Sequence, residues 1–363
     1  MENSHTWVTK ETITADKLNG LAELDGVNEI EDRLNTQSLN VKNFGAIGDG
    51  IADDTGPIQA ALDAVPENGG IVYIPAGTYL VDQQKLRDGS TDTYGALFPK
   101  PNTTMLGVGP STIIQLADGT TKVDLIYAKN TPNLKFIDLT IDAGPRNTPY
   151  WTTGLQLDTV DNLVIRDVTV TRGNIEGVYL YNSTNFDIKG LHTHDNGAWQ
   201  DDASGLHLDS DHNGVVSNII SHNNGFHGVI ISSSWEIVIN NITAHHNGWQ
   251  GLHIQTGSNK IQVTNGSFTN NSRGIYIKDW GTDNNLLSNI VVASNAYDGV
   301  LTWVTYNNII NGMQALNNGE YGVETGVNDD TIYIYASIFK NNTLGDTHEV
   351  DNSHIYINGL DEA

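Results

Sequence analysis

The chain has 363 residues, no cysteine and a formal net charge of −25 at pH 7. The lack of cysteine excludes disulfides, thiolate metal sites and cysteine nucleophiles. The negative charge disfavours nucleic acid, because affinity for nucleic acid comes from Lys and Arg that neutralise phosphates, and it also disfavours long polyanions. Among extended polymers, a neutral or weakly charged glycan is the better match.

Residues 1–38 differ in pattern from the rest of the chain. Apolar residues from Leu18 to Leu34 recur mostly three or four positions apart, which predicts one or two short amphipathic helices. Gly20 and Gly26 weaken such helices, so we expect an N-terminal anchor that oligomerisation stabilises. The segment lacks the basic start and apolar stretch of a Sec signal peptide. No apolar run is long enough to span a bilayer, so we expect no membrane partner.

A capping helix is predicted within residues 41–81. Asp54 or Thr55 can cap its start, and Pro57 suits its first turn. Three apolar residues would lay this helix over the open end of the structure that follows: Ile58, Ala61 and Leu62. Such a cover hides an exposed sheet edge.

From residue 154 onward the chain repeats a pattern of five residues. A glycine is followed by an apolar residue, an outward residue, a second apolar residue and a second outward residue. The repeats begin at Gly154, Gly177, Gly205, Gly228, Gly251, Gly274, Gly299 and Gly322. By subtraction, these glycines lie 23, 28, 23, 23, 23, 25 and 23 positions apart. A period of this length, built from short alternating strands, predicts a solenoid. We predict an all-β fold, a right-handed single-stranded parallel β-helix over residues 39–363.

The second strand of each coil carries asparagine at matching places: Asn218, Asn241, Asn265, Asn289 and Asn311. We expect these side chains to stack as a ladder inside a turn, where each satisfies the backbone of the next coil. We interpret them as structural.

Because strand side chains alternate between faces, the repeats predict two outward columns along the solenoid. The first reads Gln156, Tyr179, His207, Ile230, His253, Tyr276, Leu301 and Glu324. The second reads Asp158, Tyr181, Asp209, Ser232, Gln255, Lys278, Trp303 and Gly326. Aromatic rings suit sugar faces and polar groups suit hydroxyls, so the columns predict a glycan-binding groove. We expect substrate contacts from Tyr179, Tyr181, Asp201, Asp211, His253, Gln255, Tyr276, Lys278 and Trp303.

Carboxyl groups in this groove are candidates for glycoside hydrolysis, which needs two carboxyls in different roles. Asp209 is the leading candidate, since it lies mid-column beside His207, a second catalytic candidate. Asp158 lies two coils away, roughly 9.6 Å at about 4.8 Å per coil, near the upper end expected for an inverting pair. The 28-residue repeat adds Asp202, next to Asp201, as another acid. The choice between Asp158 and this loop as the partner of Asp209 stays open.

Lyase or epimerase chemistry on a uronate is an alternative. It removes the proton beside the uronate carboxylate, and it needs a cation to neutralise that carboxylate. The groups that could serve are Lys278, His253, Tyr276 and His207. Asp209 and Asp211 could form a calcium site, but this run lacks a recognisable calcium loop, and we expect no metal or other cofactor.

Residues 41–81, VKNFGAIGDGIADDTGPIQAALDAVPENGGIVYIPAGTYLV, resemble the leading segment of the pectate-lyase-like superfamily, which includes tailspike depolymerases, polygalacturonases and mannuronan epimerases. This resemblance implies the β-helix fold. The run WVTKETITADKLN resembles the N-terminal segments of tail and fibre proteins from phages and prophages of Gram-positive bacteria. That resemblance implies a place in the virion tail, bound to other tail proteins through the N-terminal segment. The resemblance to tailspikes implies a homotrimer.

Two further resemblances concern single motifs. Asp201 and Asp202, then His227, then Arg273 and Lys278, occur in the order of the catalytic elements of polygalacturonases, with Lys278 displaced and no Asn-Thr-Asp element before them.

The run GLHLDSDH is similar to the Tyr-Gly-Phe-Asp-Pro-His-Glu motif of mannuronan epimerases and aligns Asp209 with the motif aspartate. Leu206 stands at the tyrosine position and Asp211 at the histidine position.

Together these features predict an endo-acting depolymerase of bacterial exopolysaccharide or capsule, with Asp carboxylates that hydrolyse glycosidic bonds on the β-helix groove. One alternative is a polysaccharide lyase or mannuronan-epimerase-like enzyme. Another is a receptor-binding tail protein that holds a glycan without cleaving it. The expected location is the virion tail or the extracellular space.

Overall fold

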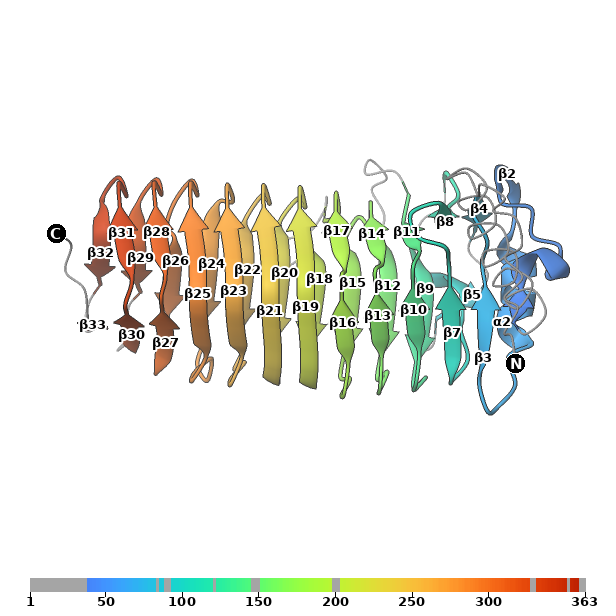
Figure 1. The fold of residues 1–363 in the computed structure, drawn as a ribbon, viewed down its shortest axis with the longest axis horizontal. Helices are drawn as coiled ribbons and strands as arrows, with labels where there is room; N and C mark the ends of the chain where they lie inside the picture. The colour runs from blue at the N-terminus through green and yellow to red at the C-terminus, as the bar shows by residue number, and fades with distance from the viewer. Residues whose placement is uncertain are drawn as a thin grey trace, which may run out of the picture.

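The computed structural model describes residues 38–82, 85–87, 93–119, 122–144, 151–197, 203–326, 331–350 and 353–358. Parallel strands stack along one axis to form a solenoid (Figure 1). Helix α2 (Thr55–Asp63) lies at the N-terminal end of the stack, and the last strands lie at the opposite end. Apart from Ser38, the predicted N-terminal anchor, residues 1–38, lies outside the described residues.

One sheet of 12 strands, sheet B, runs along the solenoid. Its strands are β5 (Lys85–Leu86), β6 (Tyr94–Leu97), β9 (Val123–Lys129), β12 (Thr152–Asp158), β15 (Glu176–Tyr181), β18 (Ser204–Asp209), β20 (His227–Ser232), β22 (Gln250–Gln255), β24 (Arg273–Lys278), β26 (Val300–Trp303), β29 (Tyr321–Thr325) and β32 (Gly345–Glu349). Strands β5 and β6 pair antiparallel, whereas each later strand pairs in parallel with the strand one coil before it.

The other sheet, sheet A, has 21 strands that form two rows. The first row contains β1 (Leu39–Asn40), β3 (Gly70–Tyr73), β7 (Thr103–Leu106), β10 (Lys135–Ile137), β13 (Val164–Arg166), β16 (Asp187–Lys189), β27 (Asn308–Asn311), β30 (Thr331–Tyr335) and β33 (His354–Asn358). The second contains β2 (Asp49–Asp53), β4 (Gly77–Val81), β8 (Thr112–Leu116), β11 (Thr140–Asp142), β14 (Thr169–Thr171), β17 (His192–His194), β28 (Gln314–Leu316) and β31 (Ile338–Lys340). Four long strands serve both rows: β19 (His212–His222), β21 (Trp235–His245), β23 (Gln262–Thr269) and β25 (Leu286–Ala293).

The core is a continuous apolar column inside the stacked coils. The residue that follows each repeating glycine, such as Leu155, Val178 or Leu206, is fully buried in it. Each coil therefore buries its apolar residues against the coils above and below, and the predicted all-β solenoid is confirmed.

The repeating glycine is required because successive coils stack closely. A Cβ on Gly228 would lie 2.6 Å from the carbonyl oxygen of Gly251 and 2.9 Å from the side chain of Asn247. A Cβ on Gly177 would lie 2.5 Å from the carbonyl oxygen of Gly205. Contacts this short force the backbone to move, which explains why every coil repeats a glycine.

Replacing Gly228 with Ala should lower the free energy of unfolding by about 1–3 kcal/mol, the usual cost of overpacking a well-filled interior. Gly56→Ala is the matched control, because Gly56 lies in α2 and a Cβ added there would have nothing within 4 Å. That control should be neutral or stabilising by up to about 1 kcal/mol. Urea unfolding of both variants checks this, and equal stabilities would show that coil stacking does not require the glycine.

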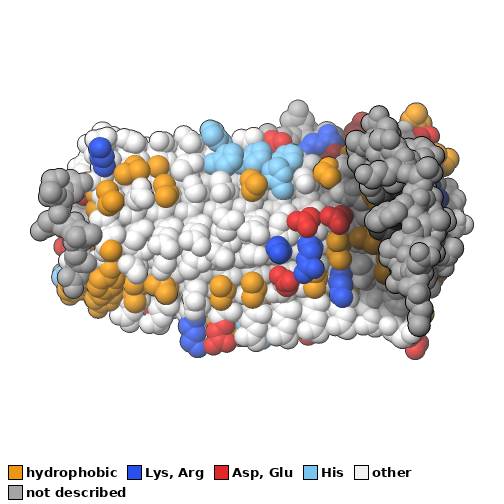
Figure 2. Space-filling view, in the orientation of Figure 1, with side chains coloured by type: hydrophobic (Ala, Val, Ile, Leu, Met, Phe, Trp, Pro, Cys, Tyr) orange, Lys and Arg blue, Asp and Glu red, His pale blue; other side chains and the backbone are white. Residues whose placement is uncertain are grey.

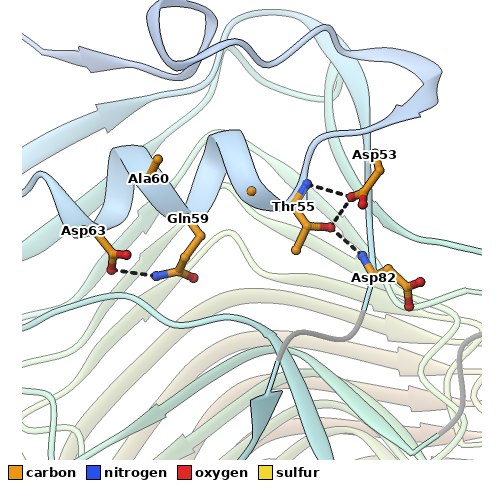
Figure 3. Close-up of a pocket in the computed structure, with 7 residues that line it drawn as sticks. Asp53, Thr55, Gln59, Ala60, Asp63 and Asp82 are labelled. Atoms are coloured by element: carbon orange, nitrogen blue, oxygen red, sulfur yellow. Dashed lines mark hydrogen bonds between the residues drawn. The ribbon is translucent and has the colours of Figure 1, made fainter.

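The capping helix is confirmed, with one change at its start. Asp54 is the N-cap residue but makes no side-chain capping bond to the helix. Its carboxylate accepts hydrogen bonds from the backbone N–H groups of Ile47 and Gly48 (2.6 and 2.8 Å). Asp53 instead accepts from the backbone N–H of Thr55 at 3.0 Å (Figure 3).

The predicted apolar face of α2 is buried, with Ile58, Ala61 and Leu62 at zero exposure. The helix therefore covers the end of the core. No helix among the described residues is long and apolar enough to cross a membrane.

The predicted asparagine ladder is partly wrong. Four of its members occupy an exposed corner with positive φ: Asn218, Asn241, Asn265 and Asn289. They bond to other side chains, as when Asn241 Nδ2 donates to Asn218 Oδ1 at 2.8 Å. Asn311 pairs with Ser288 in the register, and Gly312, at φ 70°, takes the corner position.

A different asparagine ladder satisfies the backbone. Its members lie in the next turn of each coil and are buried: Asn196, Asn224, Asn247, Asn271, Asn295 and Asn318. The Asn271 side chain accepts from the backbone N–H of Asn247 (3.0 Å) and donates to the carbonyl of Ala244 (3.0 Å). Both columns repeat at the same spacing, so the spacing alone could not tell them apart.

Histidines form a stacked column on sheet A. His194, His222 and His245 are register partners, with ring centroids 5.3 and 4.9 Å apart. His192 lies beside them, its Nε2 2.8 Å from Nε2 of His222. Figure 2 shows histidine side chains gathered at one edge of this face. Burial and the neighbouring histidines lower the pKa of His192 to about 4, and burial with the same kind of neighbour lowers the pKa of His222 and His245.

This column should make stability fall as the pH is lowered from 7 to 5. Unfolded histidine binds a proton near pH 6.5, whereas folded His192 stays neutral down to about pH 4. Between these values the unfolded state binds more protons, so acid favours unfolding. Urea unfolding at several pH values should give a weaker pH dependence for His192→Gln than for the parent chain. An identical slope in the two proteins would contradict the lowered pKa.

Candidate functional site

Both predicted columns are present on sheet B. In the first, the register pairs each residue with the next: Gln156, Tyr179, His207, Ile230, His253, Tyr276, Leu301 and Glu324. In the second, it pairs Asp158, Tyr181, Asp209, Ser232 and Gln255 in turn, and separately Lys278 with Trp303. Residues about two dozen positions apart are therefore stacked neighbours, as predicted.

The two columns differ in exposure. The middle of the first column is a covered floor, in which His207, Ile230 and His253 are 8%, 0% and 3% exposed, whereas Tyr179 and Tyr276 in that column are partly exposed. Ile230 is nevertheless outside the apolar core cluster, as expected for an outward residue that its neighbours cover. In the second column, Tyr181 and Trp303 are each 42% exposed. Ser232 and Gln255, in the middle of the second column, are buried as well, so Tyr181 and Trp303 are the exposed rings that the two columns offer to a ligand.

A third column, which the sequence pattern missed, lies just before the repeating glycines. It contains Glu176, Ser204, His227, Gln250 and Arg273. Strict alternation would have placed these side chains inside. The alternation fails because a Cβ on the glycine itself would face interior side chains, as at Gly177 against Asn196 (2.9 Å).

The third column joins the first through Glu176. Its Oε1 lies 3.1 Å from Nδ1 of His207, and its Oε2 accepts from the backbone N–H and hydroxyl of Ser204 (3.0 and 2.5 Å). His207 Nε2 lies 3.1 Å from Oγ of Ser232, which also accepts from Nε2 of Gln255 at 3.0 Å. One connected polar network thus crosses four coils.

Asp209, the leading catalytic candidate, is half-buried in the second column. Tyr179 donates its hydroxyl to Oδ2 at 2.9 Å, and Ser210 donates to Oδ1 at 3.0 Å. Burial, and then the negative charge of Asp209, raise the pKa of Tyr179 well above its usual value. Tyr179 therefore keeps its proton at neutral pH and orients the Asp209 carboxylate.

Asp158 is also half-buried, and it accepts a hydrogen bond from Gln156 Nε2 at 2.6 Å. Tyr181 is the register neighbour of both Asp158 and Asp209. The two carboxylates are thus two strand spacings apart, as predicted.

Asp211, another acidic candidate, is not part of this surface. Asp211 is fully buried and accepts hydrogen bonds from the backbone N–H groups of Ser183 (2.7 Å) and Asp209 (3.1 Å). Burial raises its pKa well above the usual value. The prediction that Asp211 contacts substrate is therefore wrong, because its buried side chain closes a turn. Asp201 and Asp202 lie outside the described residues.

His253 belongs to the covered floor, next to the partly exposed Tyr276 of the same column. Their rings stack 5.1 Å apart, and neither ring nitrogen of His253 has a hydrogen-bond partner in the described part of the chain. Burial, followed by the charges of His227, Lys278 and His207, lowers the pKa of His253 well below its usual value. His253 is therefore neutral at pH 7. It lies in the predicted column, but its side chain is buried, whereas a substrate contact was expected to be exposed.

Two arginines near sheet B are held in ion pairs. Arg87 Nη1 lies 2.9 Å from Asp124, and Arg273 Nε lies 3.0 Å from buried Asp298. Burial raises the pKa of Asp124 to about 6 in spite of its arginine. Within the described ranges, one group of three acidic side chains is close enough to share an ion: Asp298, Glu320 and Glu324. It lies four or five coils from Asp209 and includes the partner of Arg273.

A family model described as the right handed beta helix region matches residues 124–291. The chain is a right-handed parallel β-helix protein. A mannuronan C5-epimerase of Azotobacter vinelandii, AlgE5, is 36% identical over 210 residues, which are 54% of this β-helix chain and 20% of the relative. The match thus spans about a fifth of that relative.

Two solved structures share the fold. The A-module of mannuronan C-5 epimerase AlgE4 from Azotobacter vinelandii aligns with a TM-score of 0.70 and 25% identity, covering 88% of this β-helix chain and 97% of the module. The N-terminal fragment of bacteriophage phi29 gene product 12 aligns with a TM-score of 0.67 and 18% identity, covering 93% of this chain and 68% of the fragment. The predicted resemblance to β-helix proteins of this kind is confirmed for the fold.

Proposed function

We propose that this β-helix protein is a polysaccharide depolymerase that hydrolyses glycosidic bonds on sheet B. The observation that supports this is the placement of Asp158 and Asp209 in one outward column with Tyr181 between them. Two spacings of about 4.8 Å give roughly 9.6 Å, near the upper limit for two carboxyls that admit a water between them and the sugar. Tyr181 and Trp303 offer exposed rings for sugar faces.

A neutral or weakly charged glycan is the proposed substrate. Between β12 and β22, the charged side chains of the three columns that the structure describes are the carboxylates Asp158, Glu176 and Asp209. In the flanking coils, Arg273 is paired with Asp298, while Lys129 is the register partner of Asp158 and Lys278 ends β24. A polyuronate would therefore place its carboxylates against carboxylates of like charge.

A uronate epimerase or lyase is the second candidate, and the 36% identity to a protein named as a mannuronan C5-epimerase favours it. In that case Tyr179 could exchange the proton, because its hydroxyl already donates to Asp209. Lys278 lies in β24, four coils from Tyr179 in β15, so it could not neutralise the carboxylate of the same uronate. A purely binding tail protein is a third outcome. The likeness to a phage protein concerns the fold, so a tail location, a homotrimer and contacts to other tail proteins through residues 1–38 stay part of this proposal.

The products of one incubation separate these functions. Purified protein is incubated in deuterated buffer with neutral bacterial exopolysaccharides and, separately, with polymannuronate. New reducing ends without the absorbance of an unsaturated uronate support hydrolysis. Unsaturated ends indicate a lyase, and deuterium at C5 of an uncut chain indicates an epimerase. Binding without any product would leave only the receptor function and overturn the proposed enzyme.

A further inference from the structure

Three buried side chains on sheet B form a hydrogen-bonded series from a carboxylate through an imidazole to a hydroxyl. Glu176 Oε1 lies 3.1 Å from His207 Nδ1, and His207 Nε2 lies 3.1 Å from Ser232 Oγ. The exposed fractions of Glu176, His207 and Ser232 are 5%, 8% and 5%. These are the contacts by which a general base, held by a third group, activates a hydroxyl nucleophile.

The hydrogen-bond donors fix the direction of the series. The carboxylate of Glu176 is an acceptor, so His207 donates from Nδ1 and leaves the lone pair of Nε2 facing Ser232. The amide of Gln255 donates to Ser232 Oγ at 3.0 Å. The hydroxyl proton of Ser232 is therefore free to point at His207. Every member has the partner that nucleophile activation needs.

A repeating structural ladder does not account for this arrangement. In the register, His207 has Tyr179 before it and Ile230 after it, while Ser232 lies between Asp209 and Gln255. Glu176 is followed by Ser204 in the third column. The three residue types thus meet at one place in the solenoid, where β15, β18 and β20 lie side by side, and do not recur in adjacent coils.

We propose that Ser232, His207 and Glu176 form an ester-hydrolysing triad, which acts on O-acyl groups carried by the glycan. Ser232 Oγ attacks the acyl carbonyl carbon while its proton passes to Nε2 of His207. The amide N–H of Gln255 lies next to Oγ and donates to the oxyanion of the tetrahedral intermediate. Glu176 does not touch the substrate and is a positioning residue.

The remaining steps balance the reaction. The tetrahedral intermediate collapses, the bond from the acyl carbon to the sugar oxygen breaks, and that oxygen leaves with the proton from His207. Water then attacks the acyl-serine and gives a proton to His207. The carboxylic acid leaves, and the proton returns to Ser232 Oγ. The only co-reactant of this reaction is water. The choice of glycan O-acyl groups as the substrate rests on the proposed function, whereas the assignment of the triad does not.

A serine-directed fluorophosphonate and p-nitrophenyl acetate test the triad on the full chain without any glycan. We expect one covalent adduct, located on Ser232 by peptide mass spectrometry. Ser232→Ala and His207→Gln should each lower ester turnover by about 10³-fold or more and abolish the adduct. Ser217→Ala is the matched control, since Ser217 lies on sheet A in β19, and it should keep the parent rate.

Glu176→Gln distinguishes positioning from a purely structural role. We expect ester turnover to fall by about 10²-fold or more, and the acidic limb of its pH profile to move to lower pH, because the imidazolium loses its carboxylate partner. Circular dichroism and melting temperature identify any variant that fails to fold. A properly folded parent chain without a Ser232 adduct, or Ser232→Ala with unchanged turnover, would overturn the triad. Reducing-end assays on the same variants report glycosidic cleavage separately, so either activity can fail alone.

Discussion

Replacing Asp209 with Asn should lower the rate of glycan cleavage by about 10²- to 10⁴-fold, the usual contribution of a positioned acid or base. The substitution preserves the shape of the side chain and its place beside Tyr179, which donates to it at 2.9 Å. It removes the charge that can accept a proton from water. Initial rates of reducing-end formation at saturating substrate measure the effect.

Asp187→Asn is the control for this change in charge. Asp187 lies on sheet A in β16, is about half exposed and pairs with Arg166 at 3.3 Å, so its loss should leave the rate unchanged. Asp158→Asn should resemble Asp209→Asn, because hydrolysis needs both carboxyls. If Asp209→Asn cleaves at the parent rate while folding normally, Asp209 is not catalytic and the proposed pair is wrong.

The two activities proposed for sheet B use different residues. Glycosidic cleavage depends on the half-buried carboxylates Asp158 and Asp209 in the second column. Ester hydrolysis depends on the adjoining network, in which His207 bridges Glu176 and Ser232, the register neighbour of Asp209. Tyr179, which orients Asp209, and His207, which belongs to the triad, are register neighbours with rings 5.0 Å apart. One bound glycan segment could therefore contact both proposed sites.

The solenoid and its columns could be predicted because the repeat is long and regular. Each glycine marks a place where a Cβ would meet the next coil, so the chain cannot lose it without losing the stacking. Once that spacing is known, Asp158, Tyr181 and Asp209 must lie in line, and they do. The capping helix was predictable for a similar reason, since its apolar face matches the open end of the core.

The missed parts of the site depend on exceptions to alternation. Glu176 lies one position before a glycine that faces inward, so its side chain joins the outer face against the simple two-residue period. Asp211 shows the opposite error, because it lies two positions after the outward residue Asp209, yet its side chain turns inward and accepts from two backbone N–H groups. Neither exception changes the spacing of the repeats, so the sequence pattern does not reveal it. A search for polar residues beside the repeating glycine would have found Glu176.

The buried asparagines offer the sharpest test of what holds the coils together. Replacing Asn271 with Ala should lower the free energy of unfolding by about 2–5 kcal/mol, since each buried polar group left without a partner costs about 1–3 kcal/mol. The change removes the acceptor for the backbone N–H of Asn247 and the donor for the carbonyl of Ala244, in a turn where both are inaccessible to water. Urea unfolding, with reversibility checked, measures the loss.

Asn265→Gly is the matched control from the exposed corner. Asn265 has φ 55°, which glycine adopts readily, and its side chain bonds to two exposed asparagines, Asn240 and Asn289. We expect a change below about 1 kcal/mol. A large loss at Asn265 with a small one at Asn271 would reverse the assignment and restore the exposed column as the stabilising ladder. Both residues are asparagines that repeat at the same interval and hydrogen-bond to the coil before them. The predicted difference follows from burial and from the partners, which are backbone groups at Asn271 and exposed side chains at Asn265.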